Sequence, residues 1–282
     1  MTYRSKFRLA VFGVLALMAL MAASEGVAAE ASPRFGTEPP VQIVKAAPGQ
    51  KLSIVAQANL KTPRSKPPFD VTGMWKMQRS GLREPPDWEF RPMPKLTPAG
   101  QAVYDARNKA VAEGRQSLTD QDAAACYPVT MPRLMTRVWL QQMIQLPTAI
   151  VMISGFTNGV RWIYLDGREH SDPDIALPTW NGESIGRWEG NELVIDTRNF
   201  EGAHTWIQNG VPFSDQLRVI ERWRLIEDGK VLEIKFTMTD PVNWVGEWVD
   251  TKRWNLNDDK DITETHCIAA EMANLPSARS AR

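Results

Sequence analysis

Hydrophobic and polar residues alternate with a period of two over much of the chain. The pattern is clearest where Leu217, Val219, Trp223 and Leu225 share one face of a segment whose other face is rich in arginine. Such alternation is typical of β-strands with one buried face. It predicts strands over residues 69–77, 148–156, 160–167, 185–190, 192–197, 217–227, 230–239 and 243–256.

Short turn sequences join several of these strands. Asn-Gly and Asp-Gly favour tight hairpins because both residues tolerate a left-handed backbone. Hairpins are therefore predicted at three places, Asn158-Gly159, Gly190-Asn191 and Asp228-Gly229. Regularly spaced antiparallel hairpins with few helices indicate a mainly β fold, either a barrel or a sandwich.

One helix interrupts the strand pattern after the first strand. Thr97 can cap its N-terminus, Pro98 suits its first position, and Gly114 can end it. The residues between them are good helix formers. A second, short helix is predicted over residues 119–125.

The first 29 residues have the features of a secretory signal peptide. Arg4, Lys6 and Arg8 precede an apolar run over residues 9–23, and small residues follow up to Ala29. The alternative is an uncleaved membrane anchor, but the apolar run is short for a span of about 20 residues. We expect cleavage after Ala29, a periplasmic or secreted protein, and no stable membrane span afterwards.

Proline marks the next part of the chain. Residues 30–69 hold seven of the 20 prolines, which disfavour helix interiors and central strands. This part is predicted to be an extended arm, with a possible edge strand over residues 51–57. Residues 70–272 would form the β-barrel domain and residues 273–282 a flexible tail.

Composition excludes some partners and cofactors. The 33 basic and 33 acidic residues balance, and no block of Lys or Arg indicates nucleic-acid binding. Cys126 and Cys267 both lie in the exported part, where an oxidising compartment permits a disulfide; two buried thiols are the alternative. Two cysteines and three histidines do not make a structural zinc site, so we expect no metal and no cofactor.

The stretch GESIG, residues 182–186, has the G-x-S-x-G form of a hydrolase nucleophile elbow. An elbow places its serine on a sharp turn between a strand and a helix. Here a proline-containing loop precedes Ser184 and a strand pattern follows it. The stretch is better interpreted as the entry to a hairpin, with Ser184 as a nucleophile the less favoured hypothesis.

Glu221 is the one charged residue on an otherwise apolar strand face. If that face points into a barrel, the carboxylate is buried, which is costly unless it is paired or protonated. Pairing with an arginine on a neighbouring strand is one hypothesis. A general acid is the other.

Polar residues gather after the strand at 160–167, in the segment LDGREHSDPD. Their spacing matches neither an EF-hand loop nor a zinc motif. A solvated loop is the simple interpretation. The functional one places Asp166, Arg168 and His170 at the mouth of a barrel, where loops carry function on a rigid scaffold. His204 could be a further polar group beside an aromatic pocket.

The chain has 11 tryptophans, spread over most predicted strands. Core packing is the default role for each. So many large rings also suit a cavity that binds flat hydrophobic molecules. The candidate ligand-binding residues are Trp75, Trp162, Trp188, Trp206 and Trp223.

Gly73-Met74-Trp75 resembles the G-x-W signature on the first strand of lipocalin-like barrels. A larger part of the chain resembles a group of largely uncharacterised secreted bacterial proteins, over residues 126–135, 160–170, 178–200 and 213–225 and at Cys267. This resemblance implies a shared fold and export, with no known reaction. The group's pattern falls on Asp166, Arg168, His170, Trp188, Glu189, Asp196, Glu221 and Arg222. The expected fold is thus an antiparallel lipocalin-like β-barrel with an inserted helix and a proline-rich N-terminal arm.

Two functions fit this fold. The first is binding of a small hydrophobic molecule, aromatic or isoprenoid-like, in a tryptophan-rich cavity. The alternative is a lyase, isomerase or hydratase in the same cavity. In that enzyme Glu221 or Asp166 would exchange a proton, His170 or His204 would complement it, and Arg168 would stabilise negative charge. A Ser184 hydrolase is third.

Overall fold

The computed structural model describes residues 51–78, 89–114, 129–156, 159–202, 206–208, 210–257 and 260–264. All of them belong to one compact unit, Ile43–Arg282. The predicted signal peptide, the tail at 273–282, the short helix at 119–125, His204, and the proposed Cys126–Cys267 pair lie outside the described residues.

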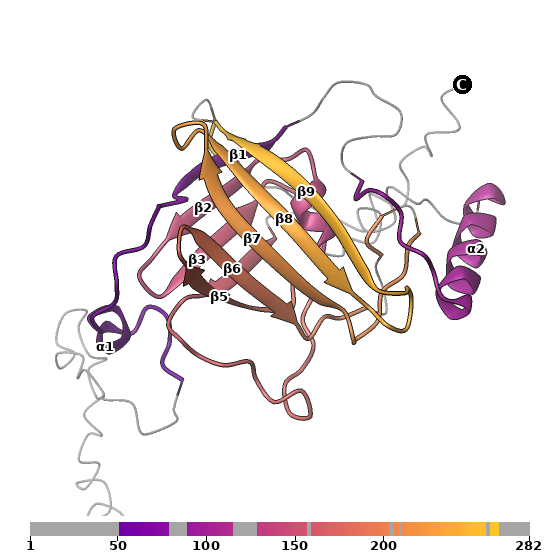
Figure 1. Ribbon diagram of the computed structural model, residues 1–282, viewed down its shortest axis with the longest axis horizontal. Coiled ribbons are helices and arrows are strands. Elements are labelled where there is room, and N and C mark those ends of the chain that lie inside the picture. Colours follow the sequence, from indigo (N-terminus) through magenta and orange to yellow (C-terminus); the bar gives the residue numbers. More distant parts are fainter. Residues whose placement is uncertain are drawn as a thin grey trace, which may run out of the picture. The chain divides into compact units, whose positions relative to one another are not determined.

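Nine strands close into a barrel, in which each strand pairs with its sequence neighbours and β9 pairs with β1 (Figure 1). The predicted mainly β barrel is therefore confirmed. The strands are β1 Gly73–Met77, β2 Gln141–Gln145, β3 Ala149–Ser154, β4 Val160–Tyr164, β5 Glu183–Glu189, β6 Glu192–Arg198, β7 Arg218–Ile226, β8 Val231–Thr239 and β9 Glu247–Leu256.

Strand β2 was not predicted, although it completes the barrel between β1 and β3. Its sequence, QQMIQ, reads as polar. Gln141 is nevertheless fully buried, because its side-chain amide donates a hydrogen bond to Ser154 Oγ at 3.1 Å. Gln141 thus takes an inward position that a hydrophobic pattern assigns only to apolar residues, although its Oε1 has no hydrogen-bond partner within the described part of the chain.

The predicted hairpins between β5 and β6 and between β7 and β8 are confirmed. Gly190 and Gly229 have φ angles of 57° and 83° at these turns. One pairing departs from the antiparallel plan, since β4 and β5 run parallel. Parallel neighbours need a crossover connection. We call this connection, residues 165–182, the crossover segment.

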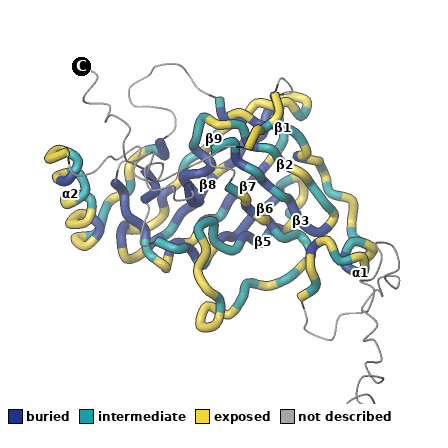
Figure 2. The backbone as a smooth tube through the Cα atoms, turned by 180° about the vertical axis from the view of Figure 1, so that it is seen from behind, coloured by how far each residue is buried: buried dark blue, intermediate teal, exposed yellow. Residues whose placement is uncertain are grey.

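The inserted helix, α2 Pro98–Ala112, begins and ends as predicted. Thr97 Oγ1 accepts a hydrogen bond from the Gly100 amide at 3.0 Å, and Gly114 has a φ of 73°. Most of the helix is exposed (Figure 2). One close approach to the rest of the chain is at Gly100, where a Cβ atom would lie 2.1 Å from the carbonyl oxygen of Asn243.

The edge strand predicted over residues 51–57 is wrong. These residues form a turn that leads into a short helix, α1 Gln57–Leu60. Residues 51–57 are held by individual contacts and not by the row of backbone hydrogen bonds of a strand pair. Ile54 is buried, and its carbonyl accepts a 2.6 Å hydrogen bond from Thr148 Oγ1.

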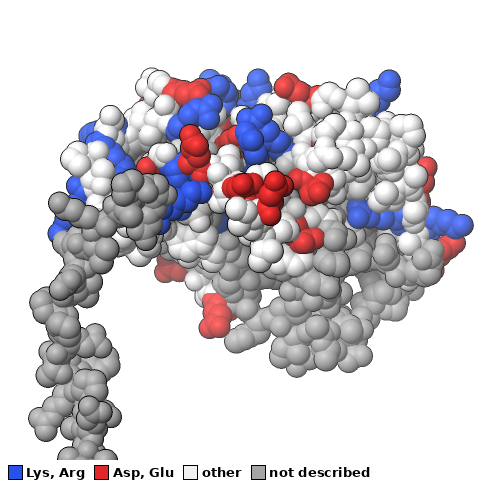
Figure 3. Space-filling model, turned by 90° about the horizontal axis from the view of Figure 1, so that it is seen from below, with Lys and Arg blue, Asp and Glu red and all other residues white. Residues whose placement is uncertain are grey.

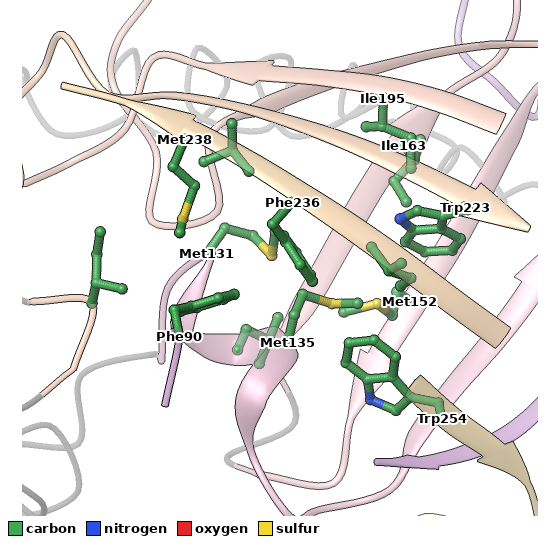
Figure 4. Packing of buried hydrophobic residues seen from close by; sticks show 14 of the residues in the cluster. Phe90, Met131, Met135, Met152, Ile163, Ile195, Trp223, Phe236, Met238 and Trp254 are labelled. Carbon is green, nitrogen blue, oxygen red and sulfur yellow. The ribbon is translucent and has the colours of Figure 1, made fainter. Parts of the chain in front are cut away.

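Large apolar side chains fill the barrel interior. Trp75, Trp223, Phe236 and Trp254 are each at most 1% exposed and belong to one buried cluster. Met131 and Met135, which lie outside the strands, also belong to this cluster. Met135 lies with Met152 of β3 between Phe236 and Trp254 (Figure 4). Within the described part of the chain, no helix is both long and apolar enough to cross a membrane.

Candidate functional site

Glu221 points into the barrel, as its strand pattern predicts, and is completely buried. Its partner is Arg161 of β4, which is also buried and not on a neighbouring strand. Arg161 Nη1 donates to Glu221 Oε1 at 3.2 Å, and Nη2 donates to Oε2. Trp223 Nε1 adds a 3.2 Å hydrogen bond to Oε1. Both carboxylate oxygens are thus engaged inside the protein.

The same arginine also holds Ser184. Arg161 Nε donates to Ser184 Oγ at 3.1 Å, and Ser184 Oγ lies 2.9 Å from Thr197 Oγ1. Ser184 is completely buried in β5, and a hairpin to β6 follows it instead of a helix. The nucleophile-elbow hypothesis is therefore wrong. The hydroxyl serves to satisfy a buried guanidinium.

The two glycines of GESIG have packing roles. Gly182 has a φ of 67°, and a Cβ atom there would lie 2.6 Å from Arg198 O and 2.8 Å from Thr197 Cγ2. A Cβ atom at Gly186 would lie 2.7 Å from Leu165 Cδ2. These positions let the crossover segment enter β5 close against β6.

We expect Gly182→Ala to lower the free energy of unfolding by about 2–4 kcal/mol, because a left-handed backbone and an overpacked contact each cost about 1–3 kcal/mol. Gly190→Ala is the matched control. Its φ is 57°, but nothing lies within 4 Å of its Cβ position, so only about 1 kcal/mol should be lost. Urea denaturation measures both. Equal losses would show that the close approach at Gly182 is unimportant.

Asp166 and Arg168 form an ion pair that fastens the N-terminal arm to the crossover segment. Arg168 Nε donates to Asp166 Oδ1 at 2.8 Å, and Arg168 Nη2 donates to the carbonyl of Leu52 at 2.9 Å. Asn59 donates to Asp166 Oδ2 at 3.0 Å. The Arg168 guanidinium also lies 4.1 Å from the ring centroid of Tyr164. Asp166 and Arg168 therefore lie together, as the sequence predicts. Their contacts, however, bind the N-terminal arm to the crossover segment.

His170 lies between two carboxylates. Its Nδ1 is 3.2 Å from Glu183 Oε2, and its Nε2 is 3.6 Å from Asp196 Oδ2, too far for a hydrogen bond. Burial by itself raises the pKa of Asp196, but His170, Arg218 and Arg198 outweigh burial and hold the pKa far below its usual value. This charged cluster lies on the outer face of the barrel, and so does the ion pair of Arg222 with Glu189. Figure 3 shows acidic and basic side chains close together on one face of the molecule.

Glu183 is held in its charged form in a similar way. Burial raises the pKa of Glu183, but hydrogen bonds from the backbone and hydroxyl of Ser171 and from His170 more than reverse this effect. The Ser171 amide donates to Oε2 at 2.7 Å and its hydroxyl to Oε1 at 2.8 Å. A carboxylate with a lowered pKa is a weak general base and a poor general acid at neutral pH.

The Asp196 cluster should make stability sensitive to acid. Because the pKa of Asp196 is lower in the folded chain, its contribution is fully present above the unfolded value of about 4 and is lost as the pH falls below it. We expect Asp196→Asn to cost about 1–2 kcal/mol at pH 7 and less at pH 3. Urea denaturation at both pH values measures this.

Glu192→Gln is the control for that experiment, since Glu192 belongs to a partly exposed ion pair with Arg222. It should change stability by about 0.5 kcal/mol or less at pH 7. A loss in Asp196→Asn that is as large at pH 3 as at pH 7 would contradict the assigned role of the Asp196 charge.

A pocket of about 580 Å³ lies between the outer face of β4 and the crossover segment. Side chains alternate along β4, so Arg161 and Ile163 are buried inside and Val160, Trp162 and Tyr164 face outward. The pocket walls include Trp162, Tyr164, Leu177 and Trp180, and the polar side chains of Ser171 and Glu183 also line it.

Hydrogen bonds hold the part of the crossover segment around Thr179 and Asn181, which forms one wall of the pocket. The Thr179 amide donates to Asn199 O at 3.1 Å, and the Glu201 amide donates to Thr179 O at 2.9 Å. Asn181 Nδ2 donates to Val160 O at 2.9 Å, while Asn181 Oδ1 is buried and has no hydrogen-bond partner among the residues that the structure describes. The side of the pocket formed by Leu177 is open to solvent, because Leu177 is 84% exposed.

The candidate tryptophans lie in different places. Trp75 and Trp223 are packed in the interior cluster. Trp188 is partly buried against Phe69, with ring centroids 4.8 Å apart. Trp206 is buried beneath guanidinium groups, including Arg107 at 5.1 Å. Of the five, Trp162 alone lines the pocket described above, where it is 42% exposed.

Sequence reasoning missed three pocket residues, Tyr164, Trp180 and Glu183. Tyr164 and Glu183 were hidden because the outward face of β4 and the start of β5 read as ordinary strand surface. Trp180 lies two residues after Pro178 in a loop, and a large aromatic residue in such a loop was the available indication. In comparisons with known proteins, no family model matches the chain, and no curated protein matches it.

Proposed function

We propose that this protein binds a small, largely hydrophobic molecule in the pocket between β4 and the crossover segment. The observation that carries the proposal is a concave site of about 580 Å³ walled by Trp162, Tyr164 and Trp180. Ligand sites usually have volumes of about 300–1,000 Å³ with apolar walls and a few placed polar groups. The proposed site is thus on the outer wall of the barrel.

The pocket chemistry supports a flat aromatic or isoprenoid-like ligand. Indole and phenol rings offer broad apolar faces for stacking. Among the described residues, the buried Oδ1 of Asn181 has no hydrogen-bond partner, so a hydroxyl or amine of a ligand that reaches this atom would satisfy it. Such a ligand combines an apolar body with one hydrogen-bond donor.

The charged groups support binding over catalysis. Glu221 is paired with Arg161 in the interior, and Asp166 is engaged by Arg168 and Asn59.

One observation favours the second candidate, acid/base catalysis in the same pocket. Glu183 lines the pocket and lies 3.2 Å from His170, so this carboxylate–imidazole couple could move a proton. The lowered pKa of Glu183 makes it a weak base for that role.

The export of this protein to the periplasm or the medium is part of the proposal. It is supported by the N-terminal sequence and by the resemblance to secreted bacterial proteins. A binding protein there would meet its ligand outside the cytoplasm, and the proposed Cys126–Cys267 disulfide would suit that oxidising environment.

The test is a fluorescence titration of the full chain with N-phenyl-1-naphthylamine, 2-naphthol and farnesol. Trp162 and Trp180 should report binding through a saturable change in tryptophan emission. Farnesol has no aromatic ring, so a preference between it and 2-naphthol separates the two ligand classes. The absence of a saturable change with all three compounds would refute ligand binding of this type.

A further inference from the structure

Trp162 and Glu183 lie side by side on the outer face of the barrel. The parallel pairing of β4 with β5 sets Ile163 beside Ser184, and both of these side chains are buried in the interior. One residue earlier on each strand, Trp162 and Glu183 therefore project from the opposite, outer face. Paired strands lie about 4.8 Å apart, so the indole and the carboxylate are neighbours in one wall of the pocket.

Glu183 carries the only charge among the described residues that line the pocket. Burial raises the pKa of Glu183, but hydrogen bonds from Ser171 and His170 lower it further, so the carboxylate stays ionised at neutral pH. Lys51 Nζ lies 3.9 Å from Glu183 Oε1, beyond hydrogen-bond distance, and its side chain is 40% exposed. Solvent screens this ammonium group, so it offsets only part of the negative charge.

Several polar side chains of the pocket use their hydrogen-bond donors inside the protein. The side-chain amides of Asn181 and Asn199 both donate to backbone carbonyl groups. Ser171 donates its amide and its hydroxyl hydrogen to Glu183. Asn181 Oδ1, in contrast, accepts no hydrogen bond from any described residue. A positively charged donor on the ligand therefore matches the acceptors that remain, and an anion does not.

We propose that the ligand is an organic cation, a largely hydrophobic body that carries a protonated amine. Its ammonium group lies against the Trp162 ring beside the Glu183 carboxylate, and its apolar body lies toward Trp180. The negative face of an indole attracts a cation, and a neighbouring carboxylate adds to this attraction. The Tyr164 ring makes a contact of this kind with the Arg168 guanidinium at 4.1 Å. The inference rests on the proposed function and adds the charge of the ligand.

Three naphthalene compounds of similar size test this charge. They are 2-(aminomethyl)naphthalene, a cation at neutral pH, 2-(hydroxymethyl)naphthalene, which is neutral, and 2-naphthoate, an anion. Isothermal titration calorimetry with the full chain measures each affinity. The amine should bind about tenfold more tightly than the alcohol, and naphthoate more weakly than both. In a pocket that is only hydrophobic, the alcohol would bind at least as tightly as the amine, because an ammonium group is costlier to dehydrate.

Two variants should move the preference for the amine in opposite directions. Glu183→Gln removes the charge and keeps an acceptor oxygen, so the preference over the alcohol should fall to about twofold or less. Lys51→Gln removes the nearby ammonium group, so the amine should bind about two- to threefold more tightly. Glu192→Gln is the control, because it removes a partly exposed carboxylate that does not line the pocket. It should leave the preference unchanged.

The outcomes separate this inference from the proposed function. If the alcohol binds as tightly as the amine, the inference is overturned, and binding of a hydrophobic molecule stands. If none of the three compounds binds, the proposed function fails and the inference fails with it. An amine preference that persists in Glu183→Gln would also overturn the inference. If that variant does not fold, the three compounds on the unaltered chain and on Lys51→Gln decide the question.

Discussion

Arg161→Ala is expected to lower the free energy of unfolding by about 3–5 kcal/mol, the range found when one partner of a buried ion pair is removed. Arg161 and Glu221 are both 0% exposed at their side chains. Without the guanidinium, Glu221 keeps only Trp223 among its hydrogen-bond donors described above. Ser184 and Thr197 lose a shared donor as well.

The control is the double variant Arg161→Met with Glu221→Leu. It removes both charges and keeps apolar volume, so it should recover most of the stability that the single variant loses. Urea denaturation followed by tryptophan fluorescence measures all three chains. A double variant as unstable as Arg161→Ala would contradict the view that the uncompensated carboxylate causes the loss.

Trp180→Ala is expected to weaken ligand binding by about 2 kcal/mol, which is about thirtyfold in the dissociation constant. Trp180 is the large aromatic residue that the crossover segment contributes to the pocket, and Trp162 is one that β4 contributes. Truncating one wall removes the stacking surface and leaves the ligand open to water. Stability should change less, because Trp180 is only partly buried.

Trp139→Ala is the control for the binding experiment. Trp139 is 47% exposed and packs against Phe156, with ring centroids 5.7 Å apart, and it does not line the pocket. It should leave the affinity for N-phenyl-1-naphthylamine unchanged within about twofold. If both variants weaken binding equally, the ligand site is not the pocket at Trp180.

The strand pattern predicted most of the barrel because a period of two reports a buried face. It placed Glu221 inside correctly for the same reason. On β4 the same pattern would place Trp162 and Tyr164 inside, but these larger apolar residues face outward and Arg161 faces the interior. An arginine reads as a surface residue from sequence alone, and only the carboxylate of β7, distant along the chain, makes its burial favourable.

Long-range contacts explain the other failures. The arm at residues 51–57 has strand-like residues, but the barrel is closed and leaves no free strand edge with which they could pair. Contacts with Asp166 and Arg168 hold this part of the arm instead. The pocket arises from the parallel pairing of β4 with β5, which brings the crossover segment across β4. Local patterns report hairpins well, but a parallel pairing has no local turn sequence to reveal it.

The most direct test of the account is the crystal structure of the full chain grown with N-phenyl-1-naphthylamine. We predict electron density for the probe in the outer pocket beside Trp162 and Trp180, with the amine toward Asn181. Probe density inside the barrel beside Trp75 and Trp223, with the outer pocket empty, would contradict the central claim.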